Sequence, residues 1–268
     1  MKNRLINILL IFALVAGLSL LLYPTVSDYW NSLHASQAVA SYDKAVKSMD
    51  EGKYDELLQS ARRYNRDLYL RGSLFSLTDE EREDYTGQLD IDGSGVMGYI
   101  EIPTIKVSLP IYHGTSDDVL QVAVGHLEWS SLPVGGESTH CVLSGHRGLP
   151  SAKLFTNLDQ LDEGDLFVIR TLDEVLTYEV DRILIVLPGE VQALAIEEGK
   201  DLCTLVTCTP YGVNSHRMLV RGHRVDNQSE AVRLTADAIR IDPLLVAPIA
   251  AIPLLLALLL RLAAAPRK

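Results

Sequence analysis

The stretch Leu202-Cys203-Thr204-Leu205-Val206-Thr207-Cys208 is followed at once by Thr209-Pro210-Tyr211-Gly212, and a second apolar run begins at Arg217. The first run is rich in β-branched residues and ends at a turn marked by Pro and Gly, so the pattern predicts two neighbouring strands. One thiol and one guanidinium then lie at adjoining strand ends. A nucleophilic cysteine needs a base, and it needs fixed positive charge for the oxyanion that it generates. This segment supplies the thiol and the charge, and the base must come from elsewhere.

The three cysteines of the chain have different expected environments. Cys203 and Cys208 lie five positions apart in one strand, so their side chains point to opposite faces and cannot readily pair. Cys208 ends the strand, where a nucleophile can reach a substrate. Cys141 and Cys203 lie within apolar runs, which is typical of small core residues. Three cysteines do not make a disulfide framework.

Several further segments carry a family resemblance. Thr204-Leu205-Val206-Thr207-Cys208 resembles the TLxTC signature of sortases, and Leu143-Ser144-Gly145-His146-Arg147-Gly148 resembles their histidine motif. Asn214-Ser215-His216-Arg217-Met218-Leu219-Val220-Arg221-Gly222 resembles their arginine strand. With Gly98-Tyr99-Ile100-Glu101-Ile102-Pro103 and Leu109-Pro110-Ile111-Tyr112-His113-Gly114, the set is most similar to class C, the pilus-assembly branch.

The residues alone leave the choice of base and cation partly open. Among seven histidines, His146 follows a strand in a Gly-rich turn that exposes its ring, and His216 is a local rival beside Arg217. Arg217 and Arg221 have even spacing in one strand and face the same side. The resemblance implies Cys208 as nucleophile, His146 as acid and base, and Arg217 as stabiliser of the oxyanion or substrate carbonyl. Arg221 is then expected to be a surface or structural charge.

Short alternating runs from Val96 to Val225 predict six to eight strands, hence a mainly β barrel or sandwich. The resemblance implies a closed eight-stranded sortase-type barrel. Helical spacing from 27 to about 70, interrupted at Gly52, predicts a two-helix arm, and Thr78 is a predicted N-cap. The predicted segments are a span (1–26), the arm and a possible lid region (27–94), the barrel (95–226), a linker (227–242), a second span (243–261) and a basic tail (262–268).

Two apolar runs are long enough to cross a bilayer as helices. The first, from Leu5 to Tyr23, is read as an uncleaved anchor, with a cleaved signal peptide as the alternative. The second, from Pro243 to Leu260, contains three prolines, which a membrane helix tolerates better than a soluble one. Basic residues outside both runs predict two cytoplasmic termini and an extracytoplasmic middle.

The resemblance implies a membrane-anchored cysteine transpeptidase of Gram-positive bacteria. It would cleave an LPxTG-like sorting signal between Thr and Gly, hold the product as a thioester on Cys208, and pass it to the lysine amine of a pilin. The other partner expected is membrane lipid. No cofactor and no metal are expected, because the Cys and His residues lack ligand spacing, and the net charge of −11 argues against nucleic acid.

The same residues are compatible with other functions. A housekeeping sortase would pass the thioester to a peptidoglycan precursor, and a papain-like peptidase would have its cysteine before its histidine, the reverse of this chain. A membrane-tethered adhesion or scaffold domain would have an inert Cys208. The Asp-Pro-aromatic lid of many class C sortases does not occur between Tyr64 and Gly95. Phe75 is the nearest candidate to fill the groove, and packing before the Thr78 helix is the alternative.

Overall fold

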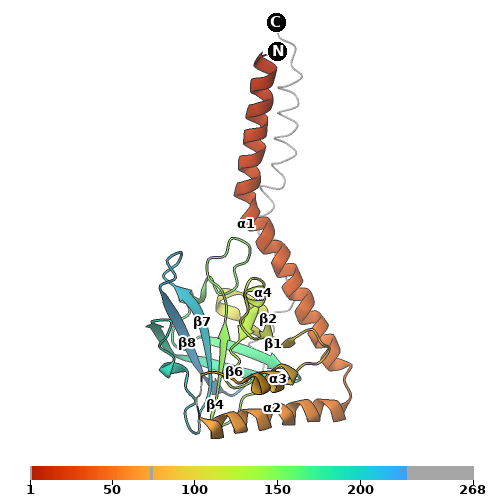
Figure 1. Ribbon diagram of the computed structural model, residues 1–268, viewed down its shortest axis with the longest axis vertical. Coiled ribbons are helices and arrows are strands. Elements are labelled where there is room, and N and C mark those ends of the chain that lie inside the picture. The colour runs from red at the N-terminus through yellow and green to blue at the C-terminus, as the bar shows by residue number, and fades with distance from the viewer. Residues whose placement is uncertain (1, 73–74, 228–268) are drawn as a thin grey trace.

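The computed structural model describes residues 2–72 and 75–227, and its centre is a closed eight-stranded barrel (Figure 1). The neighbours around the barrel are β1-β2-β3-β4-β7-β8-β6-β5, and β5 pairs again with β1. Closure pairs every strand on both sides and so leaves no edge. The predicted eight-stranded barrel is therefore confirmed. The strands are β1 (Val96–Ile102), β2 (Val107–His113), β3 (Val124–His126), β4 (Thr139–Ser144), β5 (Leu166–Thr171), β6 (Glu174–Val186), β7 (Asp201–Thr209) and β8 (His216–Val225).

Alternation along each strand sends one set of side chains into the barrel, where the largest are fully buried. Phe167 and Tyr178 stack there with ring centroids 5.4 Å apart. Gly222 on β8 passes directly behind these rings. A Cβ at that position would lie 2.7 Å from the Phe167 ring, so only glycine allows the close packing.

The three-residue strand β3 was not expected, since a run this short carries no alternation signal. The runs on either side of Asp181 form one long strand, β6, although its register with β8 shifts between Val180 and Arg182. This bulge inserts one residue and breaks the alternation in the sequence.

The helical arm surrounds part of the barrel. Its helices are α1 (Lys2–Lys47), α2 (Glu51–Arg71) and α3 (Asp79–Gly87), and the short α4 (Asp117–Leu120) lies between β2 and β3. The break between the two arm helices falls at Ser48 to Asp50 and not at Gly52, because the Asp50 side chain caps α2 by accepting the backbone N–H of Lys53. Thr78 caps α3 as predicted, in a reciprocal capping box with Glu81.

Both long helices are fixed to the barrel by buried polar contacts. On α2, the Asn65 amide donates to the Leu132 carbonyl at 3.1 Å, and its oxygen accepts the Leu132 N–H at 2.7 Å. On α1, the Tyr42 hydroxyl donates to the Met97 carbonyl and accepts the Leu172 N–H. Apolar side chains of the arm also join the buried core of the barrel, among them Leu58, Ala61 and Leu68 of α2.

The first part of α1 extends away from the barrel (Figure 1). Among the described residues, one helix, Leu9–Lys47, is long and apolar enough to cross a membrane. α1 runs without a break past Pro24 and across the predicted boundary between span and arm. The predicted second span, 243–261, and the basic tail lie outside the described residues.

Candidate active site

The chain after β4 is held against the end of β7, and this puts the turn of His146 at the level of Cys208. β4 and β7 are parallel neighbours with Ser144 opposite Val206. The pairing continues one residue further, since the Gly145 N–H donates to the Val206 carbonyl at 3.0 Å and the Thr207 hydroxyl donates to the Gly145 carbonyl at 2.8 Å. His146 is therefore the next residue in register with Cys208.

Arg217 lies on the other side of the same cysteine. β7 and β8 are antiparallel, and Cys208 is the register partner of Arg217. Directly opposite residues of such a pair have Cβ atoms about 4.5–5.5 Å apart on one face, so the two side chains leave the sheet side by side. The Arg217 Nη1 donates to the carbonyls of Asn214 and His216, at 3.2 and 3.1 Å. The strand registers thus put Arg217 opposite Cys208 and leave His146 in the turn just beyond the parallel pairing of β4 with β7.

The face that carries Cys208 and Arg217 is apolar just beside them. Val206 on β7 and Leu219 on β8 are register partners two positions away on the same face. They form a buried cluster with Val142 of β4 and Leu194 of the loop between β6 and β7. Half-buried side chains form its rim: Leu127, Trp129, Leu184, Val186 and Ala193. Apolar surface therefore adjoins the cysteine, the arginine and the histidine.

Arg221 shares the face of Arg217 but has a different environment. Its guanidinium donates to both carboxylate oxygens of Asp181, at 2.9 and 2.7 Å, and to Glu197 at 2.7 Å. The hydrogen bond and charge of Asp181 hold the pKa of Arg221 above its usual range. The bulge of β6 directs Asp181 to this position. Arg221 is a structural charge, as expected, and is not available to a substrate.

Most other histidines of the barrel are engaged in fixed hydrogen bonds. His140 is fully buried, with its ring nitrogens 2.8 Å from the Ala195 carbonyl and 2.7 Å from the Thr204 hydroxyl. Burial lowers the pKa of His140. His126 is also fully buried and contacts the Tyr85 hydroxyl at 3.0 Å. His216, the local rival, is the partner of Thr209, so strand alternation places it on the face opposite Arg217.

The remaining cysteines lie inside the barrel. Cys141 and Cys203 are register partners on β4 and β7, and both are buried. Burial raises the pKa of the Cys203 thiol, which disfavours the reactive thiolate. Cys208 is half-buried at the strand end. The expected core packing of Cys141 and Cys203 is confirmed, and Cys208 lies near the end of β7, as its position in the sequence predicted.

Arg147 is a residue of the site whose part was not predicted. Its guanidinium forms an ion pair with Asp159, donates to the Thr209 hydroxyl at 3.4 Å and lies 5.9 Å from the centre of the Tyr211 ring. It therefore joins the loop after His146 to the loop after Cys208. The position of Arg147 directly after His146 could have indicated a role in the site. Its partners could not be predicted from the sequence.

Phe75 contacts the rim of the apolar cluster. Its ring meets Trp129 edge to face, with centroids 5.2 Å apart. Together with Leu68 and Leu77 these rings line a small depression between the arm and the barrel. Phe75 therefore lies between Trp129 of the barrel and the start of α3, where Leu77 and Glu81 line the same depression.

Comparison with known proteins agrees with this geometry. The Sortase domain family matches residues 100–225. Sortase D of Bacillus subtilis is 33% identical over 131 residues, which are 48% of this chain and 63% of that protein. Sortase A of Streptococcus agalactiae is 32% identical, over 42% of this chain and 47% of its own length. The chain thus spans about half to two thirds of these two relatives.

Solved structures match over their whole length. Sortase C1 of Streptococcus agalactiae is 53% identical with a TM-score of 0.70, covering 72% of this chain and 100% of that one. Sortase C of Streptococcus pneumoniae is 42% identical with a TM-score of 0.66, covering 73% and 100%. Clostridium perfringens sortase C, solved with the C-terminal cell wall sorting motif, is 43% identical with a TM-score of 0.63, covering 71% and 99%. The chain belongs to the sortase family of cysteine transpeptidases.

Proposed function

We propose that this chain is a class C sortase that joins pilin subunits. Its similarity to three sortase C structures at 42–53% identity supports the class. The observation that carries the reaction is the register of three strands, which puts Cys208 opposite Arg217 and next in line to His146. That arrangement supplies a nucleophile, a cation and a proton carrier around one peptide bond.

The first proposed step is cleavage of an LPxTG-like signal. The Cys208 sulfur attacks the Thr carbonyl carbon, and Arg217 donates to the oxygen that becomes negative. The C–N bond to Gly then breaks, and His146 gives a proton to the departing amine. A thioester between the Thr carbonyl and Cys208 remains. The apolar cluster around Val206 and Trp129 suits the leucine and proline of such a signal.

The second proposed step is transfer to an amine. A lysine amine attacks the thioester carbon, His146 accepts the one proton that the amine releases, and the C–S bond breaks to return Cys208 as the thiolate, ready for the next attack. The product is an isopeptide bond. Because a thioester is already activated toward amines, this exchange needs no nucleotide. A pilin lysine is the proposed acceptor, and a peptidoglycan amine would indicate a housekeeping sortase instead.

The proposed location is the outer surface of the cell membrane. α1 serves as an uncleaved anchor, and its apolar part is exposed along its length. The segment 243–261 is proposed as a second span, which would leave both termini in the cytoplasm and the barrel outside.

The full chain in detergent, mixed with an LPxTG-type peptide and a lysine-containing peptide, tests this function. Mass spectrometry should detect the shortened signal joined to the lysine side chain. Cys208→Ala should abolish both cleavage and joining, whereas the matched variant Cys203→Ala should retain both, because that thiol lies inside the barrel. Cleavage by the Cys208→Ala protein would contradict the mechanism. If the parent chain leaves the LPxTG-type peptide uncleaved, the result would favour the alternative of a non-enzymatic scaffold domain.

A further inference from the structure

Large apolar side chains that are exposed on the barrel gather at one end of it. Between residues 96 and 225 five such side chains are at least 47% exposed. They are Val122, Ile185, Leu187, Tyr211 and Val213. Single exposed apolar residues are common on soluble proteins and are usually scattered. Their confinement to one end therefore needs an explanation.

This end is the one that holds the proposed active site. Tyr211 and Val213 lie in the loop directly after Cys208, between β7 and β8. Ile185 and Leu187 flank Val186, which is the register partner of Arg217. Val122 precedes β3, whose residue Gly125 pairs with Ser144 near His146. We define these five residues as the apical patch.

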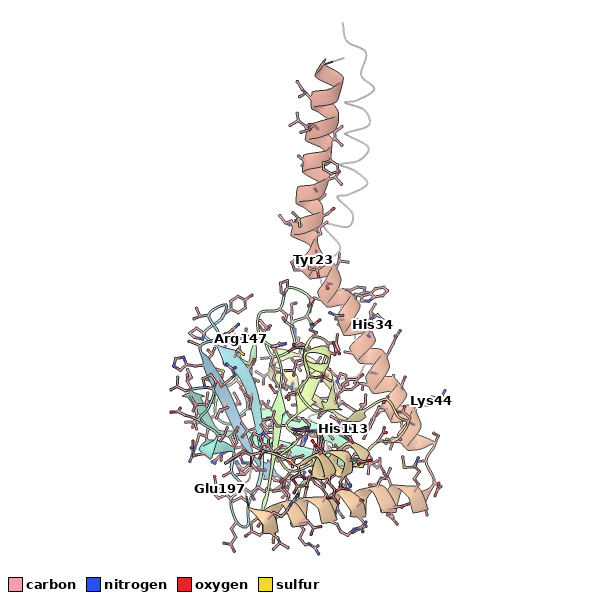
Figure 2. All side chains as sticks on the ribbon, in the orientation of Figure 1. Tyr23, His34, Lys44, His113, Arg147 and Glu197 are labelled. Carbon is pink, nitrogen blue, oxygen red and sulfur yellow. The ribbon has the colours of Figure 1, made fainter. Side chains whose placement is uncertain are left out.

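The apical patch lies at the level where the apolar run of α1 ends. The Asp28 carboxylate accepts the Lys153 N–H at 2.8 Å, and the Asn31 amide donates to the Ser151 carbonyl at 2.9 Å. Both contacts fix the loop after His146. Asp28 and Asn31 follow Tyr23 by five and eight positions, which is about 8–12 Å along a helix. Figure 2 places Arg147 at the end of the barrel toward Tyr23, with Glu197 at the opposite end.

The aromatic residues of α1 give an independent marker of depth. Tyr23, Tyr29 and Trp30 are exposed on the helix where the apolar run stops. Aromatic side chains of this kind gather at the boundary between lipid and water. Because Asp28 and Asn31 lie among them, the boundary passes close to the loops around His146 and Cys208.

We propose that the apical patch rests on the lipid surface, with the loop of Tyr211 and Val213 in contact with the headgroup region. The tyrosine ring, apolar with a polar tip, suits that environment. The proposal rests on the proposed anchoring by α1 but not on the proposed reaction. As a consequence, the end of the barrel that contains the Cys208 thiol would face the membrane surface. Substrates would then be cleaved while they are still anchored in the lipid.

Depth-dependent fluorescence quenching tests this contact with the full chain in lipid vesicles. The native tryptophans are first replaced (Trp30→Phe, Trp129→Phe), and a single reporter is introduced by Val213→Trp. The matched control is Glu198→Trp, an exposed position near Glu197 at the far end of the barrel. Lipids brominated near the headgroup should lower the emission of the reporter at 213 about twofold or more and leave that at 198 unchanged. Equal emission changes at the two positions, or none at either, would overturn the proposal.

A kinetic comparison keeps the proposal testable if the tryptophan variants fold poorly. Val213→Ser should lower the cleavage rate of a lipid-anchored sorting peptide about threefold and leave the rate for the same peptide in solution within about twofold. An equal loss with both peptides would mean that the loop contacts the peptide itself, and would overturn the lipid contact. Activity of the parent chain on the soluble peptide reports separately on the proposed function.

Discussion

Arg217 and Arg221 offer a direct test of how this face is organised. The two arginines share one strand face, but their replacement by alanine is predicted to impair different properties of the protein. They lie four residues apart, about 13 Å along a strand. We expect Arg217→Ala to lose activity with little loss of stability. We expect Arg221→Ala to lose stability with little loss of activity.

The magnitude for Arg221 follows from its contacts. Removing one partner of a fully buried ion pair costs about 3–5 kcal/mol, because the other charge is left unpaired. Arg221 is 9% exposed, but the carboxylates of Asp181 and Glu197 are 26% and 39% exposed, so water takes up part of the loss. We therefore expect Arg221→Ala to lower the free energy of unfolding by about 2–4 kcal/mol. For a protein of this size that is a fall of about 5–12 °C in Tm.

The magnitude for Arg217 differs because, within residues 2–72 and 75–227, its guanidinium bonds only to the carbonyls of Asn214 and His216. Losing these contacts should lower Tm by less than about 3 °C. Losing an oxyanion donor should lower kcat about 100- to 1,000-fold. Arg221→Ala should keep kcat within about fivefold, at a temperature where the variant is folded.

Thermal unfolding by circular dichroism and peptide cleavage, both on the full chain in one detergent, measure the two effects. Both variants remove one positive charge, so net charge is matched between them. An Arg221→Ala protein that melts within about 2 °C of the parent would refute the reasoning about the ion-pair network. Retention of full activity by Arg217→Ala would refute the assignment of the oxyanion partner.

Three further outcomes are expected. Hydrogen bonds from Arg221 to Asp181 and from Lys200 to Glu197 lower the pKa of each carboxyl below its unfolded value, so the stabilisation that the two carboxylates give is present above about pH 4 and is lost as pH falls further. Below about pH 4, Tm should drop less steeply with pH in Arg221→Ala than in the parent. Parallel curves of Tm against pH would contradict the role of this ion-pair network. Gly145→Ala would put a Cβ 2.7 Å from the Phe155 ring and displace the chain at His146, so the free energy of unfolding should fall by about 1–3 kcal/mol and kcat should fall with it. The double variant Gly145→Ala/Phe155→Leu should recover both stability and kcat. If it recovers neither, the clash with Phe155 is not the cause of the loss. Phe75→Ala removes an edge-to-face contact with Trp129 worth about 0.5–1.5 kcal/mol and should lower KM for a sorting peptide about two- to tenfold, whereas an unchanged KM would show that the peptide does not enter beside Trp129.

Much of this fold could be predicted from sequence, because alternation and turn residues mark the strands from Val96 to Val225. Periodicity alone did not choose between barrel and sandwich, since closure depends on the pairing of β5 with β1, which no local pattern records. The strand β3 was too short to detect, and the bulge at Asp181 is recorded only in the pairing of β6 with β8. Each of these features is set by partners distant in the chain.

The site shows the same division. The resemblance selected Cys208, His146 and Arg217, and alternation alone put Arg217 and Arg221 on one face. What separates the two arginines is Asp181 and Glu197, which reach Arg221 from a bulge and a loop. The contacts of Arg147 with Asp159 and Tyr211 also depend on how the loops fold, so these partners could not be predicted from the sequence.

The loop from Pro210 to Ser215 joins two strands whose ladder already fixes Cys208 opposite Arg217. The length of this loop is therefore not what determines the separation of sulfur and guanidinium. Exchanges within it that keep the Asn214 carbonyl beside Arg217 and the Tyr211 ring beside Arg147 should preserve the chemistry while they alter what the loop contacts. Changes in this loop are thus a route by which related enzymes acquire a different location or substrate while keeping one reaction. The same loop is a suitable place to graft a new recognition segment.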